Sequence, residues 1–335
     1  MMPLVTIGIP VYKRLSCLPR ALESVLKQDY PHIELLVSDN GLNGAAVRDL
    51  VAQHYNQPYI FRQNPTIVTL PAHYNQLVSA ASGKYFIWMP DDDAISSNYV
   101  SALVSILEQD RTVAVAIARQ EYVDASGCVL RISPNHAPHS ISCEQLITRW
   151  TRMGFESFTA ILARTADLRA CGGYPEFPGG THCDDAVLIK LSLGRSIALT
   201  NACVYQVQQD EASVGWSLKC QVLAEDTRRF LKFLDTDPWL LAFAECEPAL
   251  WTILKHSLIK MTWETYYYRW DTLYKARLSL VPWVRAAFAL PYIPSYYRAV
   301  RYSLWYGVKA KLLSNAKAQL QGVHRLCQAI RGRMS

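Results

Sequence analysis

The segment Tyr85-Phe86-Ile87-Trp88-Met89-Pro90-Asp91-Asp92-Asp93 decides the fold class. Its first five residues are aromatic or aliphatic, which is typical of a short buried strand. Three aspartates follow the proline, so three carboxylates stand where the strand is expected to end. Adjacent carboxylates repel one another. A fold tolerates them at such a point mainly when a cation or strong hydrogen-bond donors offset the repulsion.

The aspartate triplet alone leaves two interpretations open. In open α/β sheets ligands bind at the carboxyl ends of the strands. Mg²⁺ and Mn²⁺ prefer oxygen ligands, and a site often combines one or two carboxylates with substrate phosphates. The triplet is therefore a candidate cation site. The alternative is a solvated acidic turn in which an aspartate caps the next helix.

The chain around the triplet alternates between strand and helix patterns. The periodicity predicts strands at residues 4–9, 33–37, 59–62, 85–89, 113–119, 159–163, 196–200 and 203–207. It predicts helices at residues 17–28, 45–55, 72–81, 99–109, 143–153 and 186–193. Such alternation indicates an α/β fold with a doubly wound, mostly parallel sheet and right-handed crossovers.

Charge divides the chain into two parts. Residues 272–335 contain eleven Lys or Arg and no Asp or Glu, while the whole chain carries +6. The remaining residues, 1–271, therefore carry −5, the difference between +6 and +11. After about residue 214 the pattern becomes entirely helical, with prolines as breaks. We expect an α/β domain over residues 1–214 and a helical, basic and aromatic region over residues 215–335.

The aromatic residues of 263–306 are interleaved with basic ones. This composition suits contact with a membrane interface and anionic lipid headgroups. It equally describes a helical subdomain that packs its aromatic residues on the α/β domain and leaves the cations in solvent. Nucleic acid is not expected as a partner, because nothing upstream resembles a nucleic-acid-binding module.

Features that report on location point to the cytoplasm. The nine cysteines are odd in number, and neither a Cys-x-x-Cys pair nor zinc-ligand spacing occurs among them. Reduced thiols are therefore expected. No signal-peptide pattern is evident at the start, and the most apolar stretch, 278–293, is interrupted by Pro282, Arg285 and Pro291. We expect a cytoplasmic protein that could bind the inner face of the plasma membrane peripherally.

Two further acidic positions accompany the triplet. Asp39 also follows a predicted parallel strand, so it is expected to share one cleft with the triplet. Asp184 and Asp185 open a predicted helix, where they could act only as a cap and as acids stabilised by the helix dipole. Together the clusters suit a reaction on a phosphate-bearing donor: one places the nucleoside, one holds metal and one acts as a base.

Four motifs in order resemble the family 2 glycosyltransferases, an inverting, nucleotide-sugar-dependent class with the GT-A fold. Residues 5–14 resemble the family's first strand and P-x-Y-N turn, and residues 21–30 its following helix. Residues 33–41 resemble its V-S-D-N-G segment, and residues 80–93 its G-K-Y strand and aspartate triplet. The resemblance covers about residues 4–100. It continues more loosely to residue 213, through the Gly172-Gly173-Tyr174-Pro175 loop and the Asp184-Asp185 pair.

The resemblance implies roles for the residues that carry it. Pro10, Tyr12 and Asp39 would contact the base of a nucleoside diphosphate. Asp91 or Asp92 would touch the ribose. Asp93, together with Asp91, would hold Mn²⁺ or Mg²⁺ against the diphosphate. From the sequence alone, Tyr12 could equally be a core aromatic residue and Asp39 an Asx-turn residue.

The same resemblance implies that Asp185, or failing that Asp184, accepts the proton of the acceptor hydroxyl. Relatives often carry Glu-Asp there, so the assignment is open by one residue. Relatives also often carry a metal-binding His where this chain has Gln208, whose carbonyl oxygen is an alternative ligand. The implied reaction is transfer of a hexosyl group to a saccharide or lipid-linked acceptor, as in bacterial cell-surface polysaccharide synthesis.

Two other functions compete with this one. The first is a non-catalytic relative that keeps the fold and binds a partner or saccharide. The intact acidic clusters speak against it, because burying carboxylates that have no use costs stability. The second is a nucleotidyltransferase. The phosphate-binding loop rich in Gly, Arg and Lys that is typical of such enzymes is missing near residues 8–16, which speaks against this function.

Overall fold

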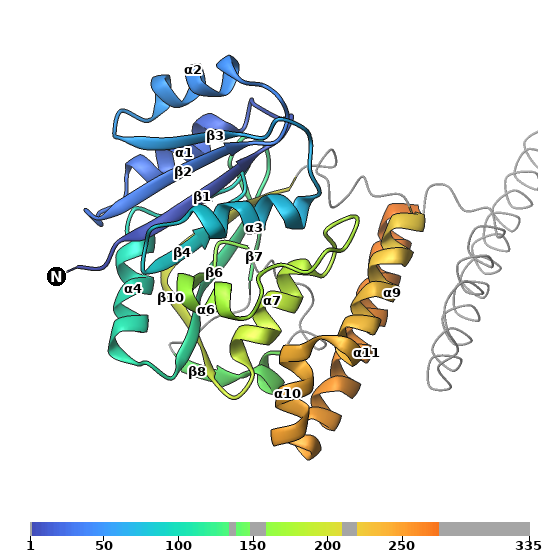
Figure 1. Cartoon of the computed structure of the whole chain (residues 1–335). Coiled ribbons are helices and arrows are strands. Elements are labelled where there is room, and N and C mark those ends of the chain that lie inside the picture. The colour runs from blue at the N-terminus through green and yellow to red at the C-terminus, as the bar shows by residue number, and fades with distance from the viewer. Residues whose placement is uncertain (1, 134–138, 148–158, 210–219, 275–335) are drawn as a thin grey trace, which may run out of the picture. The chain divides into compact units, whose positions relative to one another are not determined.

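The structure is a computed structural model that describes residues 2–133, 139–147, 159–209 and 220–274 (Figure 1). The chain divides into two compact units, residues 1–278 and 279–335, and every described residue belongs to the first. The expected boundary between residues 214 and 215 stays a prediction. The expected tail beyond residue 274 lies outside the described residues. No helix in the part of the chain that the structure describes has the length and apolar character needed to cross a membrane.

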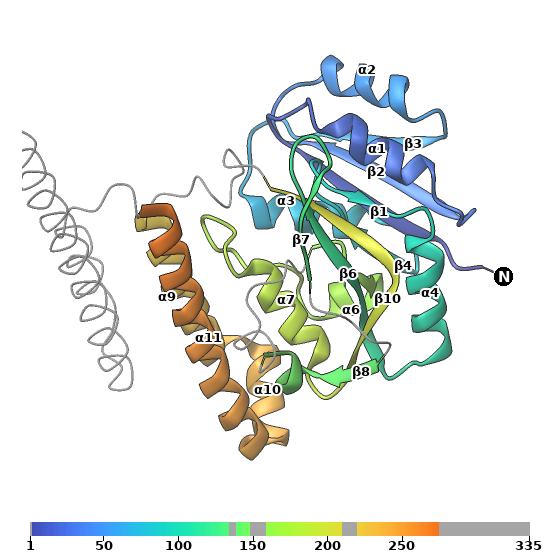
Figure 2. The same ribbon diagram turned by 180° about the vertical axis from the view of Figure 1, so that it is seen from behind.

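One sheet forms the centre of the molecule. Its main path runs β3-β2-β1-β4-β9-β6-β10-β5, while β7 pairs with β6 and β8 with β10 (Figures 1 and 2). The strands that share one direction are β1 (Val5–Val11), β2 (Ile33–Asp39), β3 (Tyr59–Gln63), β4 (Tyr85–Trp88), β6 (Val113–Val123) and β10 (Ser196–Gln208). The antiparallel strands are β5 (Ala94–Ile95), β7 (Val129–Ile132), β8 (His139–Ser142) and β9 (Leu162–Arg164).

Helices cover the sheet and bury two separate apolar cores. The first core includes residues of α1 (Leu18–Leu26), α2 (Ala45–His54) and α4 (Tyr99–Gln109). The second includes residues of α3 (Leu70–Ala80), α6 (Thr165–Ala170), α7 (Cys183–Ser192), α9 (Cys220–Thr236), α10 (Pro238–Cys246) and α11 (Pro248–Tyr274). The first face uses short helices between consecutive strands, whereas α9, α10 and α11 pack as an outer layer over α7.

The predicted fold class, a doubly wound and mostly parallel sheet followed by helices, is confirmed. The strands and helices predicted over residues 4–119 lie where their periodicity predicts them. The strand expected at 159–163 is observed as β9, shifted and antiparallel. A short apolar run carries no information about strand direction. The helix expected at 143–153 is helical over residues 143–147, and its remainder lies outside the described residues.

The last two predicted strands are one continuous strand, β10. Its pairing with β6 shifts between Thr200 and Val204, and the N–H of Ala202 donates to Thr200 Oγ1 over 3.0 Å there. Asn201 and Ala202 therefore form an irregularity inside one strand, where the sequence pattern predicted two separate strands. Short elements such as β7, whose four residues are all exposed, lack the apolar alternation that would reveal them.

Candidate active site

The three triplet aspartates lie just beyond the carboxyl end of β4, and each faces a different part of the fold. Asp92 forms an ion pair with Arg14, from the segment that follows β1. Asp93 accepts hydrogen bonds from the Tyr205 hydroxyl and from the backbone N–H of Gln208, the latter over 2.8 Å. Asp91 lies against the backbone N–H of Tyr12. The triplet is thus held by donors from the segment after β1 and from β10, and each carboxylate has its own partners.

Burial makes the charged form of two of these carboxyl groups unfavourable. It raises the pKa of Asp91 to about 7, with a further increase from the charge of Asp92 and a partial offset from Arg14. Burial also raises the pKa of Asp93 well above its ordinary value, again helped by Asp92. A cation near Asp91 would relieve this cost, because an opposite charge favours the ionised carboxyl.

The donor set fits a hard divalent cation at Asp91 better than at Asp93. Asp93 is only 3% exposed and uses both of its oxygens as acceptors. Asp91 is less enclosed, so its carboxylate is the more accessible of the two to a bound cation. No cluster of three His, Cys, Asp or Glu side chains that could hold a metal occurs among the described residues. Mg²⁺ and Mn²⁺ sites that use one or two carboxylates plus phosphate oxygens do not require such a cluster.

Gln208 stands at the position where a metal-binding His was considered. Its backbone N–H binds Asp93, and its side-chain oxygen accepts a hydrogen bond from Arg20 over 3.2 Å. Arg20 also donates to the Gln206 side-chain oxygen over 3.0 Å. The Gln208 oxygen, expected as a possible metal ligand, is therefore bound to a guanidinium group. Arg20 adds positive charge near Asp93, and this charge lowers the pKa of that carboxyl.

Asp39 ends β2 and orders the loop that follows it. Its carboxylate is fully buried and accepts hydrogen bonds from the N–H groups of Gly41 and Gly44, each over 2.8 Å. The Asn43 side-chain amide donates to it over 2.9 Å and also to the carbonyl oxygen of Tyr12. This geometry is that of an Asx turn, as the alternative interpretation expects. A contact between Asp39 and a nucleoside stays a prediction.

Tyr12 and Pro10 lie beside this loop at the end of β1. Pro10 pairs with Ser38 of β2, and the register places Val11 opposite Asp39. Tyr12 is partly exposed and belongs to neither apolar core, with the Lys13 ammonium 5.0 Å from its ring centroid. The ring is therefore accessible for stacking, and its role with a nucleoside base stays a prediction.

Asp184 and Asp185, in the first turn of α7, have different surroundings. Asp185 is paired with His182, whose Nδ1 lies 2.9 Å from Asp185 Oδ2. Asp184 lies beside Cys183 and close enough to Tyr74 to raise the pKa of its hydroxyl, after the larger effect of burial. Asp91 raises the pKa of the same hydroxyl. Asp91 and Asp184 therefore lie within electrostatic range of one phenol group.

Three aromatic rings form the floor between β4 and α7. Trp88 ends β4, Tyr74 comes from α3, and Tyr174 belongs to the loop before α7. The ring centroids of Tyr74 and Trp88 are 4.1 Å apart, and those of Tyr74 and Tyr174 are 5.2 Å apart. Burial raises the pKa of both tyrosines well above its ordinary value, so both phenols stay neutral. This floor joins the triplet edge of the sheet to the helix that carries Asp184.

Sequence reasoning did not single out several residues that hold this arrangement. Arg14 pairs with Asp92, Arg20 and Tyr205 support Asp93, and Asn75 binds the loop before α7. Their side chains come from segments distant in sequence, and no short motif signals such contacts. The apolar run around Tyr205 and the helical pattern around Arg20 were signals for secondary structure alone.

Known proteins share both the sequence motifs and the fold. Residues 6–166 match the model of glycosyl transferase family 2. An uncharacterized glycosyltransferase of Rickettsia felis is 30% identical over 132 residues, which are 38% of this chain and 21% of that protein. The glycosyltransferase GlyA of Streptococcus pneumoniae is 29% identical over 115 residues, 33% of this chain and 16% of that protein. This chain spans about a fifth of the length of the first curated relatives it matches.

Solved structures with low sequence identity have the same fold. S. aureus TarS in complex with UDP-GlcNAc aligns with a TM-score of 0.59 at 15% identity, over 84% of this chain and 79% of that one. The mannosyltransferase PcManGT from Pyrobaculum calidifontis, in complex with GDP-Man and Mn²⁺, aligns with a TM-score of 0.55 at 17% identity, over 92% and 85% of the two chains. Residues 6–166 of this chain are therefore similar in sequence to glycosyl transferase family 2, and the chain shares the GT-A fold of these glycosyltransferase structures.

Proposed function

We propose that this chain transfers a hexosyl group from a nucleoside-diphosphate sugar to a hydroxyl of a saccharide or lipid-linked acceptor, with inversion at the anomeric carbon. The observation that carries the proposal is the aromatic floor of Trp88, Tyr74 and Tyr174, whose ring centroids are 4.1 and 5.2 Å apart. It runs from the end of β4, just before Asp91, to the loop that leads into Asp184, at the carboxyl-end edge of the sheet. That edge is where open α/β sheets bind ligands.

The donor nucleotide would lie over the ends of β1 and β2. Tyr12 would stack on the base, and Pro10 would support it from the end of β1. Asp39 would contact the base directly or position it through the loop that it orders. Asp92 or Asp91 would accept a hydrogen bond from the ribose. Arg14 and Lys13 supply positive charge beside this position, which favours a diphosphate.

Mn²⁺ or Mg²⁺ would be held by Asp91, with Asp93 behind it as a second carboxylate. When bound, the cation would act as a Lewis acid that stabilises the charge developing on the departing diphosphate. The greater exposure of Asp91 supports this choice. Asp93 is tied to Tyr205 and Gln208, so its oxygens have less freedom to change partners.

A carboxylate at the start of α7 would accept the proton of the acceptor hydroxyl while its oxygen attacks the anomeric carbon. The sequence favoured Asp185 over Asp184. The contacts favour Asp184, because Asp185 is paired with His182 whereas Asp184 lies toward Tyr74 and the triplet edge. Asp185 would then hold the first turn of α7 through His182.

A donor panel tests the proposal. The intact chain is incubated with UDP- and GDP-sugars, beginning with UDP-GlcNAc and GDP-mannose, and release of the nucleoside diphosphate is measured with Mn²⁺, with Mg²⁺ and in chelator. Release from at least one donor that depends on Asp91 supports the transferase. Binding of a donor without release, in the presence of either cation and a panel of saccharide acceptors, would favour the non-catalytic alternative.

We also propose that the basic, aromatic tail binds anionic membranes peripherally, on the sequence evidence alone. Each Lys or Arg near an anionic surface contributes about 1 kcal/mol, so several together would localise the chain. Co-sedimentation with anionic vesicles at low and high salt tests this. Binding that falls steeply with salt is expected, because a Debye length of about 10 Å at 0.1 M screens the attraction. No binding at low salt would contradict it.

A further inference from the structure

The loop before α7, residues 174–182 (the bridging loop), lies between α3 and α9. On the α3 side, Thr69 Oγ1 donates to Glu176 Oε2 over 2.7 Å. On the α9 side, Arg229 Nη1 donates to the carbonyl oxygen of Glu176 over 3.2 Å. The loop leads directly into the turn that carries Asp184 and Asp185, so its position decides where those carboxylates lie.

Asp226 of α9 binds the end of the bridging loop through a fully buried carboxylate. The N–H of Gly179 lies 3.0 and 3.1 Å from its two oxygens, and the N–H of Thr181 lies 2.9 Å from Oδ2. Gly180, between them, has φ +72°. The loop therefore folds around this carboxylate. Burial raises the pKa of Asp226 overall, while the two N–H groups and the nearby His182 favour its charged form.

The next residue of the loop, His182, is held from two sides. It has φ +69°, in the left-handed region that non-glycine residues rarely adopt. Its buried ring lies 4.8 Å from the Phe230 ring of α9, and its Nδ1 contacts Asp185. Asp226 and Phe230 are four residues apart in α9, so they lie on one face of the helix. That face of α9 contacts the backbone of the bridging loop and the His182 ring, and the His182 ring in turn pairs with Asp185.

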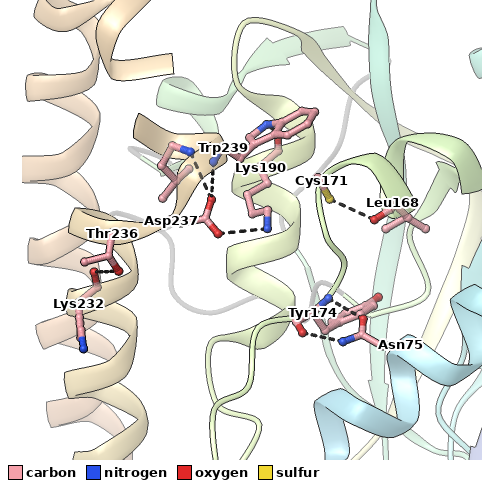
Figure 3. Close-up of polar contacts among 10 residues, drawn as sticks. Asn75, Leu168, Cys171, Tyr174, Lys190, Lys232, Thr236, Asp237 and Trp239 are labelled. Atoms are coloured by element: carbon pink, nitrogen blue, oxygen red, sulfur yellow. Dashed lines mark hydrogen bonds and ion pairs between the residues drawn. The ribbon is translucent and has the colours of Figure 1, made fainter. Parts of the chain in front are cut away.

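The far end of α7 is bound by the same helical layer (Figure 3). Lys190 is buried, and its ammonium lies 3.3 Å from Asp237 Oδ2. Asp237 also caps α10 through Oδ1, and the Trp239 indole N–H donates to the Lys190 carbonyl oxygen over 2.9 Å. Asp226 thus binds the loop that enters α7, and Asp237, the N-cap residue of α10, binds the far end of α7.

We propose that Asp226 is a positioning residue for the carboxylates at the start of α7, and that α9 is thereby a functional part of the transferase site. The inference rests on the proposed function. Asp226 makes no contact with the reacting atoms. It fixes the backbone of 179–182, which sets the His182 ring and the orientation of the first turn of α7.

The test compares Asp226→Asn with Asp235→Asn in the full chain. Both changes remove one negative charge from α9, but Asp235 is an exposed residue whose carboxylate pairs with Lys255 of α11. In Asp226→Asn an NH₂ group replaces one of the acceptors for the Gly179 and Thr181 N–H groups. Donor hydrolysis is followed with the active donor from the panel. The affinity for the nucleoside diphosphate, the pH profile of kcat and amide hydrogen exchange of residues 179–182 are measured as well.

Asp226→Asn is expected to lower kcat at least about tenfold, because small misplacements of catalytic groups cost this much or more. The nucleotide affinity should stay within about twofold of wild type, while the acidic limb of the pH profile shifts because it reports the base. Hydrogen exchange should rise in 179–182 and stay unchanged in α1. Asp235→Asn should match wild type in every measurement.

Unchanged kcat and pH profile in folded Asp226→Asn would overturn the inference, even if its melting temperature falls, because the role would then be structural only. If Asp226→Asn does not fold, Phe230→Leu removes the ring from His182 while keeping an apolar side chain, and it is judged by the same criteria. Failure of the proposed function is distinguishable, because the wild-type chain would then turn over no donor. Unchanged exchange at 179–182 in Asp226→Asn would still reject the positioning role in that case.

Discussion

Asn75 of α3 binds both backbone groups of Tyr174: its Oδ1 accepts from the N–H and its Nδ2 donates to the carbonyl oxygen, each over 2.8 Å (Figure 3). One amide side chain thus ties the bridging loop to the helix beneath the proposed donor site. Gly173 permits this approach. A Cβ at Gly173 would lie 2.2 Å from Asn75 Oδ1, and the residue has φ +65°.

We expect Gly173→Ala to reduce the free energy of unfolding more than Gly172→Ala. Both glycines have positive φ, so both substitutions carry the conformational cost of about 1–2 kcal/mol. A Cβ at Gly172 meets only the Lys190 ammonium at 3.7 Å, whereas one at Gly173 displaces Asn75. Urea denaturation of both variants measures the difference. Equal losses would contradict the role given to the Asn75–Tyr174 contact.

Chelation of divalent cations is expected to abolish donor turnover, and Mn²⁺ or Mg²⁺ to restore it. Asp91→Asn should weaken the response to the cation, because it removes the carboxylate whose ionisation a cation would favour. Asp93→Asn should lower stability as well as activity, since Asp93 accepts from Tyr205 and Gln208. Cation titrations of both variants, alongside thermal melts, separate the two effects. Full turnover in chelator would contradict metal dependence.

Substitution of the two acids of α7 should identify the base. If Asp184 is the base, Asp184→Asn lowers kcat by about 10²- to 10⁴-fold while nucleotide affinity is retained. Asp185→Asn should have a smaller effect, because it weakens a contact with His182 and leaves the proton acceptor in place. The kcat values and nucleotide dissociation constants of both variants decide the matter. A larger loss of kcat in Asp185→Asn than in Asp184→Asn would identify Asp185 as the base, which is the residue that the sequence favoured.

His73 is expected to make stability fall with acid. Burial lowers the pKa of His73 to about 4, and its Nε2 lies 2.8 Å from Ser38 Oγ, next to Asp39. Because the unfolded chain binds the proton more readily, the contribution is full above about pH 6.5 and is lost as the pH falls toward 4. The loss amounts to about 3 kcal/mol.

The free energy of unfolding, measured between pH 7 and about 4, should therefore fall less steeply with decreasing pH in His73→Gln than in wild type. His32→Gln is the matched control, since His32 is an exposed histidine. The control should keep the wild-type slope. A His73→Gln slope equal to that of wild type would show that other groups cause the loss.

The fold was largely predictable because its signals are local. Alternating apolar runs fix strands and helices such as β4 and α4, and this alternation selects a parallel, doubly wound sheet. Positions at strand ends also follow from the pattern, so Asp39 and the triplet could be assigned to one edge. The antiparallel direction of β9 and the continuity of β10 could not be predicted, because both depend on pairing between distant segments.

By itself, the sequence determined the fold class, the family motifs and the edge of the sheet at which the acidic clusters gather. Only the tertiary structure decided which partner each carboxylate has: Arg14 for Asp92, Tyr205 and Gln208 for Asp93, His182 for Asp185, and the bridging loop for Asp226. Backbone periodicity is set by neighbours along the chain. Hydrogen bonds and burial that tune a carboxylate come from segments joined only when the cores close, and these contacts leave no periodic trace in the sequence.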